Sequence, residues 1–254
     1  MLFTVAVDAH DFWVQPDLFQ PEPGQEVRVS LRIGENLSGD SLPFVPDWFV
    51  DYRVVGPAGP KPIDAIIGDI PAGRFTPSES GIYLIAHQTT ADFVDMEAGK
   101  FNSYLVKEGL TTALEARAAA GTDSDSGREY YSRYAKALVK AGDDTAEFDG
   151  PRQELGYRLE IIPLLDPYEL QPDATLPLAV KYEGELLAGI TVIAFNSAAP
   201  ENQQRVVTNK SGKAEIRVDD SKGVWLIKAI HMIAREPDSG ADWESFWASL
   251  TFRL

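Results

Sequence analysis

The chain has 254 residues, 44% of them hydrophobic, and a formal net charge of -16, which allows one large or two ordinary domains but disfavours binding to nucleic acid. It has no cysteine, which excludes disulfides, thiolate metal sites and cysteine nucleophiles. No apolar run approaches the roughly 20 residues that a membrane-spanning helix needs, so no transmembrane segment is predicted.

The first nine residues, MLFTVAVDA, resemble the end of a signal peptide. A short apolar run is followed by small or short residues at Val7, Asp8 and Ala9, as signal peptidase requires. We therefore expect residues 1–9 to be the remnant of a signal peptide, cleavage to occur before His10, and the protein to be periplasmic. A plain N-terminal strand is the alternative interpretation.

Extended segments dominate the chain up to residue 96. Hydrophobic and polar residues alternate from Val27 to Ile33, which is typical of a strand with one buried face. Strands are also predicted from Phe49 to Val55 and from Ile82 to His87, and the extended pattern returns from Tyr157 to Ile162. These segments predict an N-terminal β-sandwich domain over residues 10–162.

A helical insertion is predicted at about residues 97–142, within this first domain. Gly109 is a natural helix stop, and Ser126 with Glu129 has the spacing of a capping box at the start of a later helix. We expect the insertion to cover one end of the sandwich. The side chains expected to face the sheet are Phe101, Tyr104, Tyr130, Tyr134 and Leu138.

Short, regularly spaced strands follow in residues 163–254 and predict a second β-sandwich domain. Residues 224–233 are apolar on both strand faces, which favours a central strand, and Phe246 to Phe252 is expected to return antiparallel to it. The T-N-x-x-G-x-A turn from Thr208 to Ala214 resembles prealbumin-like modules of the carboxypeptidase-regulatory kind. The predicted fold class is mainly β, with two Ig-like or prealbumin-like β-sandwich domains and a helical insertion in the first.

Motifs of the common enzyme classes are missing from the sequence. It contains no Gly-rich phosphate loop, no G-x-S-x-G elbow and no H-E-x-x-H helix, so we predict that the protein is not an enzyme. The remaining candidates are the three histidines, His10, His87 and His231. A single histidine in a strand is more often a structural residue than a ligand.

Two of these histidines have features that favour a metal site. His10 would carry both an α-amine and an imidazole if the mature chain began there, and the two groups can chelate one ion. His231 lies on a largely apolar strand face, where an imidazole requires an explanation. We predict that His10 and His231 converge on a divalent transition metal ion, with His87 as a third candidate ligand.

Four stretches carry a family resemblance: H-D-F-W-V-Q-P at His10–Pro16, V-x-V-x-L-R-I-G-x-N-x-S-G-D at Val27–Asp40, K-F-N-S-Y-L-V-K-E-G-L at Lys100–Leu110 and G-V-W-L-I-K-A-I-H-M at Gly223–Met232. Together they resemble a family of bacterial periplasmic proteins of unknown function. Its members are described, by similarity, as accessory components that handle the substrate in nickel or cobalt uptake. The resemblance implies a signal peptide that ends before His10 and metal handling through His10 and His231.

Two functions from different classes therefore stay open. The first is a periplasmic protein that binds a divalent transition metal and acts beside a membrane metal importer, with nickel or cobalt favoured and copper or zinc possible. The second is a non-catalytic β-sandwich interaction module for a carbohydrate or an envelope protein, with structural histidines. An oxidative copper enzyme with an N-terminal histidine brace is a more distant third.

Overall fold

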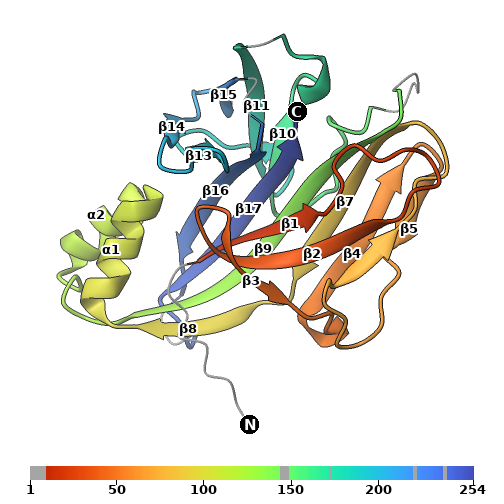
Figure 1. The fold of residues 1–254 in the computed structure, drawn as a ribbon. Coiled ribbons are helices and arrows are strands. Elements are labelled where there is room, and N and C mark those ends of the chain that lie inside the picture. Colours follow the sequence, from red (N-terminus) through yellow and green to blue (C-terminus); the bar gives the residue numbers. More distant parts are fainter. Residues whose placement is uncertain (1–9, 144–148, 172, 220–221, 237–238) are drawn as a thin grey trace.

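The computed structural model describes residues 10–143, 149–171, 173–219, 222–236 and 239–254. The predicted signal-peptide remnant at residues 1–9 lies outside this part of the chain. Figure 1 shows a mainly β protein, as the sequence predicts, with one pair of helices at its edge. No helix in the described residues is long and apolar enough to cross a membrane.

The largest sheet in the described residues has nine strands. Along its main path the strands are β14 (Gln204–Val207), β13 (Thr191–Asn196), β16 (Val224–Ala234), β17 (Trp243–Arg253), β9 (Gly127–Ala141), β7 (Gly81–Thr89), β4 (Phe49–Gly56) and β5 (Gly59–Pro62). A further strand, β8 (Asp92–Met96), pairs with β9. The expected central strand is confirmed, because β16 lies between β13 and β17 and is antiparallel to both.

Two smaller sheets, each of four strands in the described residues, cover the two faces of the large sheet. One consists of β1 (Asp11–Pro16), β2 (Val27–Glu35), β3 (Ser38–Leu42) and β6 (Gly73–Phe75). The other consists of β10 (Leu159–Pro163), β11 (Ala174–Tyr182), β12 (Glu185–Leu186) and β15 (Lys213–Val218). The short 3-10 helices Pro46–Trp48 and Pro167–Glu169 lie in connecting loops.

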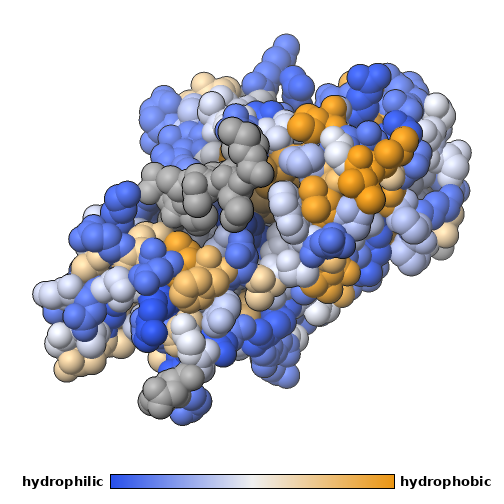
Figure 2. All heavy atoms as spheres, turned by 90° about the horizontal axis from the view of Figure 1, so that it is seen from below, coloured by the Kyte–Doolittle hydropathy of each residue, from blue (hydrophilic) through white to orange (hydrophobic). Residues whose placement is uncertain are grey.

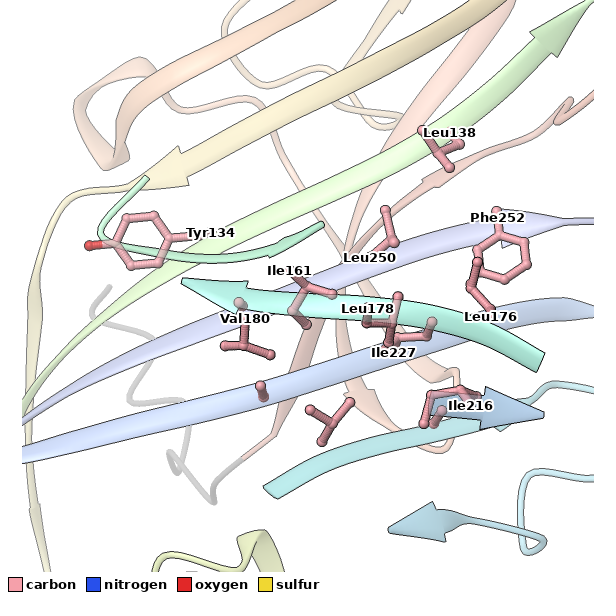
Figure 3. Close-up of a cluster of buried hydrophobic side chains, with 14 of the residues drawn as sticks. Tyr134, Leu138, Ile161, Leu176, Leu178, Val180, Ile216, Ile227, Leu250 and Phe252 are labelled. Carbon is pink, nitrogen blue, oxygen red and sulfur yellow. The ribbon is translucent and has the colours of Figure 1, made fainter. Parts of the chain in front are cut away.

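Alternation along β7 explains why both faces of the large sheet carry a core. Ile82, Leu84 and Ala86 point to the cluster under β10, β11 and β15, whereas Tyr83 and Ile85 point to the cluster under β1 and β2. Figure 3 shows the first cluster, in which side chains from β9, β16 and β17 meet side chains from the small sheet. The molecule is therefore two sandwiches that share their central sheet.

The predicted domain boundary between residues 162 and 163 falls within β10, before its last residue, and the large sheet continues across it. Strand β9 from the first part pairs in parallel with β17 from the second, over nine residue pairs from Glu129–Trp243 to Ala137–Thr251. The core of Figure 3 likewise combines residues from both sides of the boundary. The two predicted parts thus share one sheet and one core.

The helical insertion is shorter than predicted. Helices α1 (Ala98–Glu108) and α2 (Thr111–Ala120) form, and Gly109 ends α1 in the left-handed conformation, with φ of 72°. The later predicted helix is wrong, because its residues form the long strand β9. Tyr134 and Leu138 are buried from this strand, and Glu129 is a strand residue rather than part of a capping box.

Helices α1 and α2 cover the same face of the large sheet as β1. Phe101, Tyr104 and Leu105 of α1 form a buried cluster with Ile230 and Met232 of β16. Lys228 lies on that same face of β16, two residues before Ile230, and its side chain contacts Asp11 of β1. The start of β1, the end of α1 and the strand β16 therefore meet at one place.

Candidate functional site

His10 lies immediately before β1, beside a small cavity. The half-buried residue precedes Asp11, and the strand that follows is fixed in the protein by Phe12 and Val14. The cavity has a volume of about 10 Å³, close to what a single water molecule requires, and therefore admits one small ligand atom. Its lining residues are His10, Val94, Met96, Tyr104, Glu129, Tyr131, Arg133 and Trp247.

Glu129 of β9 is the carboxylate of this cavity, and it is almost fully buried. Its Oε1 accepts hydrogen bonds from the hydroxyl of Tyr104, at 3.2 Å, and from the hydroxyl of Ser245. Trp247 in turn donates its ring N–H to the Ser245 hydroxyl at 2.8 Å, and its ring stacks on Tyr104 with 5.5 Å between centroids. These contacts fix the walls of the cavity around the carboxylate.

Burial decides the charge of Glu129. The loss of solvation raises its pKa to about 7, although the hydrogen bonds from Ser245 and Tyr104 and the charge of Arg133 oppose the shift. The Arg133 guanidinium lies 4.6 Å from the ring centroid of Tyr131 and 5.6 Å from that of Phe12. Because Arg133 brings a positive charge to the cavity, a bound cation requires Glu129 in its ionised form.

A buried ion triad anchors the chain next to His10. The Lys228 ammonium lies 2.5 Å from Oδ1 of Asp11 and 2.8 Å from Oε2 of Glu108, which is the last residue of α1. Burial opposes the charged form of Lys228, but the two carboxylates raise its pKa above the ordinary value. The triad therefore joins β1, β16 and α1 and sets where His10 lies.

His87 is fully buried and surrounded by aromatic rings. The ring centroids of Phe49, Phe12 and Tyr52 lie 4.5, 5.2 and 5.3 Å from that of His87. Neither ring nitrogen has a hydrogen-bond partner among the described residues. Burial lowers the pKa of His87 to about 3, with a further contribution from Arg133, so the side chain is a neutral part of the core.

His231 lies on the opposite face of the large sheet from His10. Across β16 and β17, Ile230 pairs with Trp247 and His231 with Phe246, and successive strand residues point to opposite faces. Trp247 lines the His10 cavity, whereas His231 packs against Tyr182 with 4.5 Å between ring centroids. Burial lowers the pKa of His231, although the charge of Glu183 opposes the shift.

The predicted convergence of His10 and His231 is therefore not formed. Among the described residues, no three histidine, cysteine, aspartate or glutamate side chains form a group that could hold a metal ion. Of the three histidines, His10 is the one beside a cavity that a carboxylate also lines. Its donor set combines an imidazole nitrogen, the Glu129 carboxylate and the thioether of Met96, and a chain that begins at His10 would add an α-amine.

Glu129 and Lys228 are site residues that the sequence interpretation missed. The sequence pattern predicts a helix cap at Glu129, whereas the residue reaches the cavity because β9 is a strand. Lys228 has a local signal in the sequence, because it is the one lysine in the largely apolar strand β16. A lysine in such a position is rarely buried without a partner, so it predicts a carboxylate from elsewhere in the chain.

Stability should depend on pH through Glu129. Between about pH 4.5 and pH 7 the folded protein holds the Glu129 proton more tightly than the unfolded chain, so the free energy of unfolding falls as pH rises. The expected loss is about 3 kcal/mol across this window, and it is complete above the folded pKa. Glu129→Gln cannot bind this proton. Its free energy of unfolding should therefore rise relative to that of wild type by about 3 kcal/mol between about pH 4.5 and pH 7.

Urea unfolding of both proteins across this pH range measures the difference directly. Glu115→Gln, at an exposed position on α2, is the matched control and should follow the wild-type profile. A difference between wild type and Glu129→Gln that does not change with pH would contradict the raised pKa.

Comparisons with known proteins identify the family of the chain. No curated protein sequence matches it. Among solved structures, the D0-D1 domain of Intimin is similar at 10% sequence identity, with 95% of this chain and 97% of that chain covered and a TM-score of 0.21. A family model described as a domain of unknown function, DUF4198, matches residues 7–233, and the chain belongs to this family.

Proposed function

We propose that the protein binds a divalent transition metal ion through His10 in the periplasm and acts as a non-enzymatic accessory of nickel or cobalt uptake. The observation that carries the proposal is the cavity of about 10 Å³ that His10, Glu129 and Met96 line together. Nitrogen, carboxylate and thioether donors suit late first-row metals, copper and zinc included. Nickel and cobalt are preferred because of the family resemblance of the sequence.

The residues around the cavity support a single bound ion rather than a larger ligand. The hydrogen bonds from Tyr104 and Ser245 both end on Oε1 of Glu129 and hold the carboxylate in one orientation. Such outer contacts orient metal ligands and increase affinity. The triad around Lys228 fixes the start of β1, so that His10 is positioned before an ion binds.

Calorimetric titration of nickel, cobalt, copper and zinc into protein that begins at His10 tests the proposal. We expect one ion per chain, and an affinity that falls at least about tenfold for Glu129→Gln or for protein with a residue added before His10. His231→Ala is the matched control and should bind as wild type does, because His231 faces the other side of the sheet.

The affinity should also fall as pH drops below about 7. Bound imidazole and α-amine must be deprotonated, with ordinary pKa values near 6.5 and 8. Glu129 becomes protonated in the same range, because its pKa is about 7. Absence of binding, or equal affinity in all of these proteins, would overturn the proposal.

An interaction module is the second candidate, and a group of exposed apolar side chains favours it. Large exposed apolar residues concentrate in two segments of the first half: Trp48 and Val50 lie around the start of β4, and Ile66, Ile67 and Ile70 lie in the loop before β6. Hydrogen bonds from the Phe44 N–H to the Asp69 carbonyl and from the Gly68 N–H to the Phe44 carbonyl join this loop to the chain that leads to Trp48. Figure 2 shows apolar residues gathered on one part of the surface, as is typical of contact sites. If the titration shows no metal binding, the interaction module becomes the better interpretation.

A further inference from the structure

Half of the exposed large apolar side chains in the described residues lie together, in the loop before β6 and around the start of β4. We call this group the apolar loop patch. Its members are Trp48, Val50, Ile66, Ile67 and Ile70. Single exposed apolar residues such as Val106 and Val207 need no explanation, whereas a group of this kind marks a contact site.

A tight turn carries the two most exposed side chains of the patch. The Asp69 N–H donates a hydrogen bond to the Ile66 carbonyl at 2.9 Å, and Gly68 has a φ of 91°, as in a type II turn. Ile67 therefore occupies the tip, where the turn itself requires no apolar residue. Because Ile66 and Ile67 are 64% and 76% exposed, both project from the surface and suit insertion into an apolar phase.

The backbone of this turn finds its hydrogen-bond partners inside the protein. The Ile66 N–H donates to the Asp69 carboxylate at 3.0 Å, and the Gly68 N–H donates to the Phe44 carbonyl at 2.9 Å. A peptide group that enters the apolar part of a lipid layer has no water to bond, so its partner must come from the protein. The N–H groups of residues 66, 68 and 69 meet this requirement.

Trp48 lies at the end of the 3-10 helix that follows Phe44. Its carbonyl accepts a hydrogen bond from the Thr90 N–H at 2.8 Å, and the ring of Phe44 packs on that of Phe49 with 5.5 Å between centroids. The segment is thus fixed to the protein, while the indole of Trp48 is 49% exposed. An indole has an apolar body and one N–H donor, and it prefers the boundary between water and lipid.

The charges of the two segments exclude one class of lipid. Residues 44–50 and 65–72 contain two carboxylates, Asp47 and Asp69, and no lysine, arginine or histidine. Proteins that dock on anionic lipid do so through clustered basic side chains. The net charge of -16 also repels an anionic bilayer and a second copy of the chain. The patch therefore matches a lipid surface without net charge.

We infer that the apolar loop patch docks the protein on a zwitterionic lipid surface, with Ile66 and Ile67 inserted among the acyl chains and Trp48 at the level of the headgroups. Removal of apolar side chains from water drives this contact, so binding persists at high salt. The inference goes beyond the proposed function, because none of the patch residues lines the His10 cavity.

Sedimentation of the metal-free full chain with phosphatidylcholine vesicles tests this inference. Wild type should bind, and binding should weaken when phosphatidylglycerol replaces part of the lipid. The double variant Ile66→Ser, Ile67→Ser should lower the partition coefficient at least about tenfold, because two apolar side chains no longer leave water. The matched control is Val106→Ser with Val207→Ser, at 63% and 59% exposure outside the patch, and it should bind as wild type does.

Tryptophan fluorescence gives a second readout of the same contact. In the described residues Trp48 is the one exposed tryptophan, so vesicles should shift the emission of wild type to shorter wavelength. Trp48→Phe should abolish the shift while most of the binding remains. An unchanged urea midpoint of the double isoleucine variant shows that it is folded.

The outcomes decide what covers the patch. Vesicle binding by wild type and by the valine control, with loss in the double isoleucine variant, supports the inference. No binding by wild type, equal binding by the double isoleucine variant, or tighter binding to phosphatidylglycerol overturns it. A dimer in sedimentation velocity that the double isoleucine variant abolishes would assign the patch to a second copy, and this too would overturn it. Because the protein is metal-free, each of these outcomes is independent of the metal titration.

Discussion

Lys228→Met should lower the free energy of unfolding by about 3–5 kcal/mol, because it leaves Asp11 and Glu108 buried without their shared cation. All three side chains are removed from water at the place where β1, β16 and α1 meet. A buried charge without a partner cannot recover its lost hydration, whereas an exposed one can. The loss should be visible in urea unfolding followed by tryptophan fluorescence.

Two control proteins define the cause of that loss. Lys181→Met removes a lysine from the more exposed ion pair with Glu154 and should cost at most about 1 kcal/mol. A triple variant, Asp11→Asn, Lys228→Met and Glu108→Gln, removes every charge of the triad and should recover much of the stability. If Lys228→Met costs no more than Lys181→Met, the triad does not anchor the start of β1.

Phe101→Ala should cost about 3–5 kcal/mol, because its ring is fully buried between α1 and the large sheet. The ring packs against Tyr104, with 5.7 Å between centroids, and the Arg117 guanidinium lies 4.9 Å from its centre. The backbone of Gly127 approaches so closely that an added Cβ would lie 2.3 Å from the ring. A smaller side chain therefore leaves a cavity that the surrounding strands cannot fill.

Val106→Ala is the control on the same helix, because Val106 is 63% exposed. Its effect on thermal or urea unfolding should stay within about 0.5 kcal/mol. Equal effects of Phe101→Ala and Val106→Ala would show that α1 and α2 are a loose appendage and do not take part in the core.

The sequence predicts most of the strands because their burial follows a period of two. Alternation identifies β2, and the two apolar faces of the segment that forms β16 identify a central strand. Helix α1 is also recognisable, since Gly109 ends it where the apolar spacing ends. In these segments local sequence and tertiary structure favour the same conformation.

Strand β9 shows why a pattern can fail. Tyr130, Tyr134 and Leu138 are four residues apart, and this spacing fits one face of a helix as well as one face of a strand. Local periodicity therefore could not distinguish the two. Pairing with β7 on one side and β17 on the other decided the matter, because both provide backbone hydrogen bonds along nearly the whole segment.

Sequence by itself determined the mainly β class and the helix that ends at Gly109, and it singled out His10 as a candidate ligand. Only the tertiary structure decided which groups surround it: Glu129 reaches the cavity from β9, and Lys228 meets Asp11 across 217 positions of the chain. It also placed His231 on the far face of the sheet and His87 in the aromatic core. The physical reason is that periodicity fixes which face of a strand a side chain occupies, whereas the order and register of strands depend on packing between distant segments.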